Sequence, residues 1–205
     1  MSGTTEAKKT RLRGGRRRPV AGRADILEAA RAIGVRDGWG AVTIRAVATK
    51  LGYSSPLLYE HFRDKEHLLT EIAVDGLNRL HAELAVDLPE SSRAAAVVMI
   101  DRYWRFVVEN TQLYRLMNGM DGRLIDNEAI GQAAQSFCGF LADAILPLLG
   151  KDATVAEAMV LTYELWALLH GMAALYLDRS IPFDSAEVVD AGLRLIAGAA
   201  KRSAG

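Results

Sequence analysis

The chain has 205 residues, of which 50% are hydrophobic, and this is enough to bury a sizeable core as one compact unit or two small domains. No apolar run reaches the ~18 residues that span a bilayer, and no apolar segment follows the basic N-terminus as in a secretory signal, so we expect a cytoplasmic protein without a membrane partner. The single cysteine, Cys138, excludes an internal disulfide, and the formal net charge of zero hides an uneven distribution along the chain.

Residues 1–23 form a basic arm. They contain eight lysines and arginines against one glutamate, so they carry a charge of +7 and the remaining residues carry −7. The arm is rich in Gly, Arg, Lys and Thr and has almost no apolar residues, which is typical of a segment that is disordered when free. It is compatible with a nucleic-acid-binding arm, a solubilising tail or an organelle transit segment.

Residues 24–75 have the pattern of three short helices that lead into a longer fourth helix. Gly38 ends the first helix, and the second begins after Thr43 as N-cap and stops at Gly52. The apolar residues recur at helical spacing on one face of each helix, at Ile26, Ala30 and Ile33 in the first and at Ile44, Val47, Ala48 and Leu51 in the second.

The third and fourth helices follow after short turns. Ser55 is expected to cap the third helix, which begins at Pro56 and continues to Phe62. Asp64 is expected to cap the fourth helix, whose apolar stripe consists of Leu69, Ala73, Leu77, Leu80 and Leu84.

Two helices joined by a glycine-containing turn, and braced by neighbouring helices, indicate a helix-turn-helix, whose second helix enters the major groove of DNA. In this segment the chain resembles the TetR family of transcriptional regulators. The resemblance rests on Thr43, the Gly52 turn, the run Leu58-Tyr59-x-His61-Phe62, and Lys65 followed by Leu68 and Leu69. It implies an all-α fold, with an N-terminal helix-turn-helix unit of three helices at residues 24–75 and a C-terminal helical domain for ligand binding and dimerisation at residues 76–205.

The sequence departs from the family pattern at three positions. Gly34 stands where relatives usually place an aromatic residue, and it costs the first helix roughly 1 kcal/mol relative to alanine. Glu60 would be repelled by phosphates unless it binds a cytosine amino group or pairs with a neighbour. Leu57 replaces a small polar residue on the reading face, so we expect a thymine methyl at that contact.

The candidate phosphate contacts are hydroxyl, aromatic and basic side chains around the turn. Tyr59 and His61 resemble the backbone-clamping pair of the family, although a core position for Tyr59 and a capped surface position for His61 are alternatives. Hydroxyl groups and the amides that begin helices also suit phosphate oxygens. The full set is Thr43, Ser54, Tyr59, His61 and Lys65.

The candidate base-reading residues are Ser55, Pro56 and Leu57, at the start of the third helix. Residues 24–70 hold six basic and six acidic residues, so this unit has no net positive charge of its own. The arm must therefore supply the long-range attraction, and Arg16, Arg17 and Arg18 are expected to enter the adjacent minor groove.

Residues 76–205 are helical throughout by periodicity, with turns expected at residues 89–91, 110–111, 121–122, 150–152 and at Pro182. The run Trp166-Ala-Leu-Leu-His170-Gly171 resembles the Trp-His-Gly element of one TetR C-terminal subgroup. An apolar wall with few polar atoms is typical of a pocket for a small apolar or aromatic effector, with an ordinary helical core as the alternative. The candidate ligand-binding residues are Trp104, Tyr114, Met117, Met159, Tyr163, Trp166 and His170.

The last two helices, at about residues 155–178 and 185–200, are expected to form a homodimer. A narrow stripe at Val188, Gly192, Leu195, Ile196 and Ala199 favours close helix packing, either between two copies or inside one core. A two-fold dimer predicts a near-palindromic double-stranded operator. The expected function is that of a transcriptional regulator. The resemblance to the TetR family implies a repressor that a small-molecule effector releases from its operator. A helical ligand-binding protein that does not act through DNA is the alternative.

An enzyme is not expected. The four histidines form no Glu-x-x-His or His-x-x-x-His pair, Cys138 has no adjacent base, and no phosphate-binding glycine loop occurs in the sequence. We therefore expect neither a metal nor a cofactor.

Overall fold

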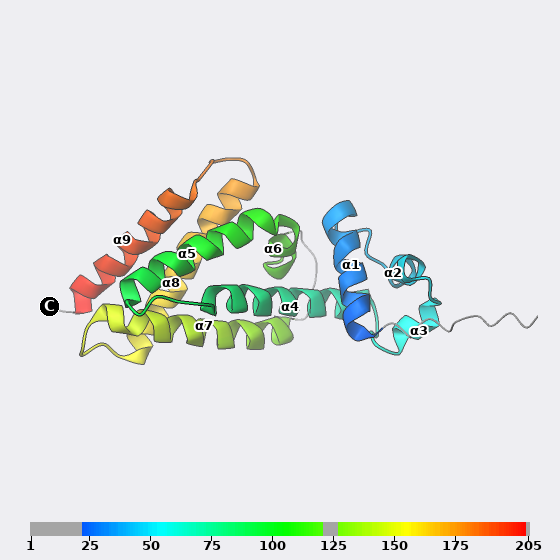
Figure 1. Cartoon of the computed structure of the whole chain (residues 1–205), viewed down its shortest axis with the longest axis horizontal. Helices are drawn as coiled ribbons and strands as arrows, with labels where there is room; N and C mark the ends of the chain where they lie inside the picture. The colour runs from blue at the N-terminus through cyan, green and yellow to red at the C-terminus, as the bar shows by residue number, and fades with distance from the viewer. Residues whose placement is uncertain (1–21, 121–126, 204–205) are drawn as a thin grey trace, which may run out of the picture.

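The structure is a computed structural model that describes residues 22–120 and 127–203, and these residues form nine α-helices and no strand. Figure 1 shows an elongated molecule with a small three-helix unit at one end and a helical bundle at the other. The all-α fold and its two-part arrangement are therefore confirmed. The basic arm up to residue 21 and the turn expected at residues 121–122 lie outside the described residues.

The N-terminal unit consists of α1 (Arg23–Asp37), α2 (Ile44–Leu51) and α3 (Ser55–Tyr59). The predicted limits of α2 are confirmed: the Thr43 hydroxyl oxygen accepts from the backbone N–H of Ala46 at 3.0 Å, and Gly52 has a φ of 74°. The positive φ favours glycine, because other residues strain in this region.

The prediction for α3 was wrong at both ends. Ser54, not Ser55, is the N-cap, because its carbonyl accepts the first helical hydrogen bond from the N–H of Leu57. The helix ends at Tyr59 because the N–H groups of His61 and Phe62 both turn back to the carbonyl of Leu58. This tight turn buries the Phe62 ring completely.

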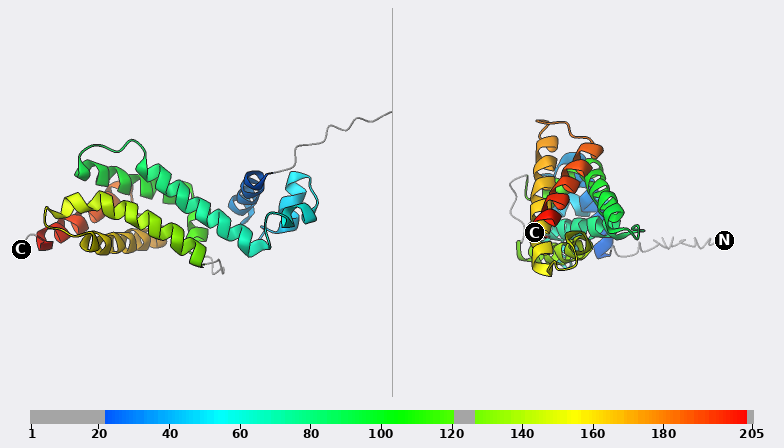
Figure 2. Two further views of the ribbon diagram at one scale, coloured as in Figure 1. Left: turned by 90° about the horizontal axis from the view of Figure 1, so that it is seen from below. Right: turned by 90° about the vertical axis from the view of Figure 1, so that its left-hand side faces the viewer.

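Helix α4 (Lys65–Ala85) joins the two parts of the molecule. Asp64 accepts from the N–H of His67 at 2.8 Å, as predicted for its N-cap. Figures 1 and 2 show α4 running from the N-terminal unit into the bundle, where it packs against α5, α6 and α7. Four of the five residues of the predicted stripe are buried and Leu77 is partly buried.

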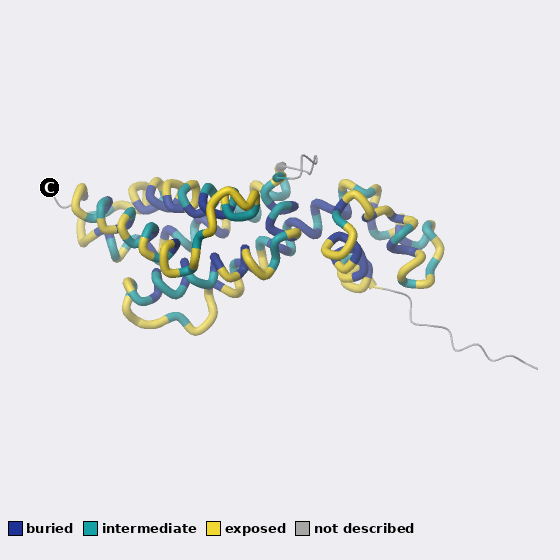
Figure 3. The backbone as a smooth tube through the Cα atoms, turned by 90° about the horizontal axis from the view of Figure 1, so that it is seen from above, coloured by how far each residue is buried: buried dark blue, intermediate teal, exposed yellow. Residues whose placement is uncertain are grey.

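The bundle contains α5 (Ser92–Glu109), α6 (Thr111–Met117), α7 (Asn127–Leu149), α8 (Val155–Leu177) and α9 (Ser185–Ser203). The turns expected at residues 89–91 and 150–152 and at Pro182 separate these helices. The turn expected at residues 110–111 is confined to Asn110, because Thr111 already begins α6. Figure 3 shows that the buried backbone runs through the bundle, along α4 and into the N-terminal unit. One continuous core therefore connects the two parts.

Two bundle helices are long, apolar and only partly buried within this protomer. Glu128–Leu149 and Val155–Leu177 are long and apolar enough to cross a membrane by length and composition, a property they share with core helices of soluble bundles. In an apolar 18-residue stretch of each helix, only 28% and 39% of the residues, respectively, are buried. The remaining apolar surface is available for contacts outside this protomer.

The stripe of α9 packs inside the protomer. Val188 is fully buried, and a Cβ added at Gly192 would lie 2.7 Å from Cδ1 of Ile100 on α5. Gly192 is therefore needed for the close approach of α9 to α5 of the same chain. This packing corresponds to the alternative in which the stripe belongs to the core of one protomer. The dimer contact expected through this stripe needs another surface.

Candidate nucleic-acid interface and apolar cavity

The α2–turn–α3 segment presents hydroxyl groups to solvent. The Thr43 side chain is exposed, and because its oxygen accepts from Ala46, its O–H is still able to donate. Ser54 is also exposed and makes no side-chain capping bond. Both hydroxyls are thus placed to donate to an anionic oxygen.

The other predicted contacts around α3 differ in exposure. The Tyr59 side chain is 56% exposed, so the alternative of a core aromatic is wrong. Pro56 is exposed, whereas Ser55 and Leu57 are half-buried and Leu57 packs partly against the core. His61 is half-buried.

Two basic residues brace the N-terminal unit. Arg23 begins α1, and it donates to the carbonyl of His61 at 2.9 Å, pairs with Glu71 and lies 4.6 Å above the Phe62 ring. Lys65 donates from Nζ to the carbonyl of Gly40 at 3.0 Å. Arg23 therefore belongs to the folded unit, although the sequence placed it in the arm.

Sequence reasoning missed the exposed cations of this unit. Arg45, Lys50 and Arg63 are exposed, and within the described residues neither Arg45 nor Arg63 forms an ion pair. By contrast, Arg36 is held by Asp37, and this side-chain hydrogen bond lowers the pKa of the Asp37 carboxyl. The position of Arg45 on the polar face of α2, opposite its apolar stripe, is the signal that could have found it.

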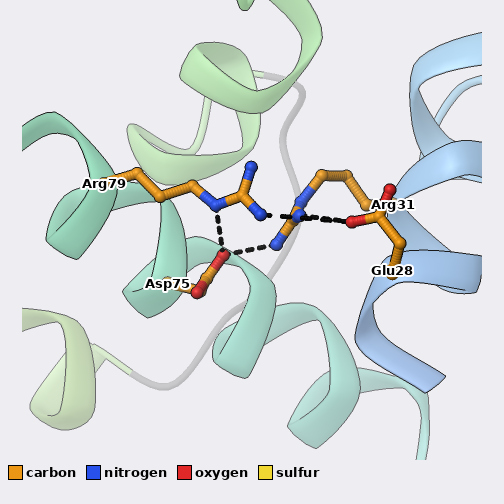
Figure 4. A network of polar contacts seen from close by, with 4 residues as sticks. All are labelled: Glu28, Arg31, Asp75 and Arg79. Carbon is orange, nitrogen blue, oxygen red and sulfur yellow. Dashed lines mark hydrogen bonds and ion pairs between the residues drawn. The ribbon is translucent and has the colours of Figure 1, made fainter. Parts of the chain in front are cut away.

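A network of charged side chains joins α1 to α4 (Figure 4). Arg31 is 11% exposed and donates to Glu28 at 2.7 Å and to Asp75, which also pairs with Arg79 at 2.9 Å. The Nε of Arg31 has no partner among the described residues. A charge held this way is costly to leave unpaired, so α1 and α4 keep a fixed relation.

A second joint connects α1 to α6 through Trp39. A Cβ added at Gly34 would lie 2.2 Å from ring atoms of Trp39, so the indole occupies the space above the glycine. Its Nε1–H donates to the carbonyl of Gln112 at 2.8 Å. The aromatic residue missing from α1 is thus replaced by one from the following loop.

The bundle contains a small apolar cavity of about 50 Å³ between α4, α5, α7, α8 and α9. None of the described residues that line it is charged, and its polar side chains are Tyr103, Thr162 and Trp166. A smaller cavity of about 20 Å³ adjoins it and shares Tyr103 and Trp166 with it. A lining of apolar side chains with few polar groups is typical of small-molecule sites. The free space is smaller than the roughly 300–1,000 Å³ of an open ligand pocket, so the helices must move apart to admit an effector.

A chain of three hydrogen-bonded side chains ends at this cavity. The hydroxyls of Tyr103 and Tyr114 lie 2.6 Å apart, and the Tyr114 hydroxyl lies 2.8 Å from Nδ1 of His170. Burial raises the pKa of Tyr103 far above its ordinary value and raises the pKa of Tyr114 to about 12. Burial also lowers the pKa of His170, so all three groups are neutral near pH 7.

The predicted ligand residues are divided by the structure. Trp166 lines both cavities, Tyr114 and Met117 line the smaller one, and His170 reaches it through Tyr114. A Cβ at Gly171 would meet nothing within 4 Å, so no close packing in this protomer requires a glycine there. The resemblance to a Trp-His-Gly subgroup therefore stays a prediction.

Three predicted ligand residues lie outside both cavities. Trp104 packs edge-on against Tyr176 and Phe183, Met159 packs at the margin of the core, and Tyr163 is 49% exposed. The inner face of α8 runs through Thr162, Leu165 and Leu169, which is one position away from the predicted face. Sequence reasoning therefore missed Thr162 and Leu165.

Two family models match this chain. The model described as "Bacterial regulatory proteins, tetR family" matches residues 26–72, and the model described as "Tetracyclin repressor-like, C-terminal domain" matches residues 96–196. The matches cover the N-terminal unit and the bundle with its cavity.

Similar proteins and structures extend over most of the chain. An uncharacterized HTH-type transcriptional regulator of Mycobacterium tuberculosis is 29% identical over 88% of this chain and 83% of its own length. The HTH-type transcriptional activator FasR of Mycolicibacterium smegmatis is 22% identical over 82% and 78%. A protein with unknown function from Rhodococcus sp. RHA1 has the same fold, with a TM-score of 0.73 and 21% identity over 91% of this chain and 98% of that one. The fatty acid degradation regulator FadR from Bacillus halodurans has a TM-score of 0.67 and 12% identity over 85% and 97%.

Proposed function

Because this chain belongs to the TetR family of bacterial regulatory proteins, we propose that it is a transcriptional repressor that leaves its operator when a small apolar or aromatic effector binds. One observation carries the proposal: helices α4 and α6 connect an exposed helix-turn-helix to a bundle that contains an uncharged cavity. The protein is proposed to act in the cytoplasm without a membrane partner, and to have no catalytic activity.

The operator is proposed to be held by two sets of contacts. Phosphates are bound by Thr43, Ser54, Tyr59, His61 and Lys65, with Arg45 and Arg63 added by their exposure. Bases are contacted by Ser55, Pro56 and Leu57 in the major groove, and Arg16, Arg17 and Arg18 of the arm reach the minor groove.

The homodimer is proposed to form through α8 and the outer side of α9. Val155, Val160 and Tyr163 on α8 are 58%, 57% and 49% exposed. An apolar helix face of this kind is costly to leave in water, and a two-fold axis through it would pair α8 and α9 with their copies. Two recognition helices then require a near-palindromic operator.

The proposed mechanism is a shift between two conformations. Met117 lines the smaller cavity and also lies against Gly76 of α4, where a Cβ would be 2.7 Å from its sulfur. The preceding residue of α4, Asp75, binds Arg31 of α1. An effector that fits one arrangement of these contacts better changes the population of the DNA-binding form, by no more than its difference in affinity for the two forms.

The alternative to a repressor is an activator of transcription. FasR, which is similar over most of this chain, is named as an activator. An activator would use the same interface and cavity, and would bind its operator more tightly in the presence of the effector. A ligand-binding protein of this fold that does not use DNA would bind no specific duplex.

Selection of bound sequences from a random duplex pool tests the proposal. We expect a near-palindromic sequence whose binding is weakened by a ligand that occupies the cavity. Enrichment that a ligand strengthens would contradict release by the effector, and no enrichment at low salt would refute DNA-binding regulation of either sign.

The arm has a separate test. A variant that lacks residues 1–21 keeps Arg23 and the α1 cap, so it should fold without the basic residues that are proposed to enter the minor groove. We expect weaker operator binding and a flatter dependence on salt, by about 0.9 in the logarithmic slope for each phosphate that the arm neutralises. Equal slopes for the full and shortened chains would show that the arm does not bind DNA.

A further inference from the structure

The two cavities contain no group that could neutralise a charged ligand. Among the described residues that line them, none is acidic or basic. A lone carboxylate or ammonium group loses its hydration on entry, and this costs several kcal/mol unless a partner charge or several hydrogen bonds replace the water.

Most polar atoms of the lining are already engaged. The Thr162 hydroxyl donates to the carbonyl of Ala158 at 2.8 Å, and the Asn118 amide donates to the carbonyl of Tyr114 at 2.9 Å. Tyr103 is shared by both cavities, is 5% exposed, and its hydroxyl has Tyr114 as its partner. A phenol can make a further hydrogen bond, so Tyr103 is a polar point around which a ligand would be oriented, together with the indole N–H of Trp166, which also lines both cavities.

The chain from Tyr103 to His170 can present either a donor or an acceptor. When the imidazole proton is on Nε2, Nδ1 accepts from Tyr114, Tyr114 accepts from Tyr103, and the Tyr103 oxygen accepts from a ligand hydroxyl. When the proton is on Nδ1, all three bonds reverse and Tyr103 donates to a ligand carbonyl or hydroxyl oxygen. Neither arrangement supplies a net charge.

We infer that the effector is a neutral, largely hydrocarbon molecule with a single hydroxyl or carbonyl group, and that Tyr103 binds this group at the junction of the two cavities. The inference rests on the proposed role of the cavity as the effector site. It excludes carboxylate and ammonium ions that carry the same hydrocarbon, because their charged group would meet Tyr103 with no residue of opposite charge in the lining.

Matched ligands test the charge preference. The full chain is titrated by calorimetry at pH 7.5 with 1-decanol, decanoate and decylammonium, and with 2-naphthalenemethanol and 2-naphthoate. We expect at least one alcohol to bind with a Kd below about 1 mM and at least tenfold more tightly than its charged counterparts. A carboxylate or ammonium that binds as tightly as its alcohol, or the failure of both alcohols to bind, would overturn the inference.

A single hydroxyl tests the contact itself. Tyr103→Phe keeps the ring and removes the oxygen, and we expect it to weaken alcohol binding about two- to tenfold while decanoate stays weak. Tyr176→Phe is the matched control, because Tyr176 packs against Trp104 and lines neither cavity. Equal alcohol affinities in Tyr103→Phe and the parent would show that the polar group is bound elsewhere.

Operator binding of the unliganded protein separates this inference from the proposed function. A protein that selects a DNA sequence but prefers charged ligands contradicts only the ligand class. A protein that selects no sequence contradicts the regulator itself.

Discussion

Gly34 and Trp39 occupy one packing site together. The Trp39 ring is 2% exposed and covers the glycine so closely that a methyl group cannot fit. Alanine normally stabilises a helix relative to glycine by about 1 kcal/mol. At this site the contact with the ring opposes that preference.

We predict that Gly34→Ala destabilises the protein by about 1–3 kcal/mol, because the indole must move out of a well-packed position. The free energy of unfolding in urea measures this change. Gly131→Ala in α7 is the matched control, since a Cβ there meets nothing within 4 Å. The control should gain about 0.5–1 kcal/mol from helix propensity, and a gain in both variants would refute the packing argument.

His170 gives the protein a dependence on acid pH. Burial lowers the pKa of His170, so near pH 6 the folded chain binds fewer protons at this residue than the unfolded chain. The stabilisation is complete above the ordinary histidine pKa of about 6.5 and is lost as the pH falls toward the lower, folded pKa.

We predict that unfolding free energy declines between about pH 7.5 and 5.5, and that His170→Asn removes part of the decline. The asparagine oxygen can replace Nδ1 as acceptor for Tyr114 but does not titrate. Comparing the two proteins cancels the other three histidines. Identical pH profiles would exclude His170 as a source.

Residues whose partners are close in the sequence could be predicted, and residues with distant partners could not. Thr43 and Asp64 bond to amides three residues away, so their capping roles follow from local pattern. Trp39 bonds to Gln112, which is 73 residues away, and no local pattern indicates that contact.

At the scale of elements, the predicted helices were confirmed wherever polar and apolar faces are distinct. Helix α2 has one apolar stripe and was placed to the residue. Helix α8 is apolar on most sides, so its periodicity could not show which face lines the cavity, and the predicted face was one position away. Its outward residues, such as Tyr163, satisfy the same spacing as inward ones.

The joint between α1 and α6 depends on one hydrogen bond from Trp39. We predict that Trp39→Phe lowers stability by about 1–3 kcal/mol, because the carbonyl of Gln112 loses its donor and the indole atoms that lie over Gly34 are removed. Hydrogen exchange should become faster in α1–α3 and change little in α7–α9.

Trp104→Phe is the control for this variant. Trp104 packs among aromatic rings of the bundle, so its replacement should affect α5 and α8 and leave α1–α3 protected. Equal exchange changes in α1–α3 for the two variants would mean that Trp39 has no special role in the joint.

At the scale of the whole molecule, the uncovered face of α8 is the surface proposed for dimerisation. Val160 lies in the middle of this face and is 57% exposed. We predict that Val160→Glu weakens dimerisation at least tenfold, because a carboxylate would be buried without a partner between two copies. Sedimentation analysis over a concentration series measures the change, and operator affinity should fall with it.

Val108→Glu on α5 is the matched control. Val108 is 41% exposed and lies on α5, which is not part of the proposed dimer surface. It should remain dimeric and bind DNA normally. A monomeric parent protein would refute the proposed dimer, and a dimer unaffected by Val160→Glu would place the assembly surface elsewhere.

Cys138 is the one sulfhydryl of the chain, and it lies in the wall of the smaller cavity beside Tyr114. Burial raises the pKa of this thiol, so it is a poor nucleophile while the helices stay packed. The natural chain therefore carries a built-in reporter: a maleimide dye can attach at a single point, and its rate of attachment measures how often the interior opens.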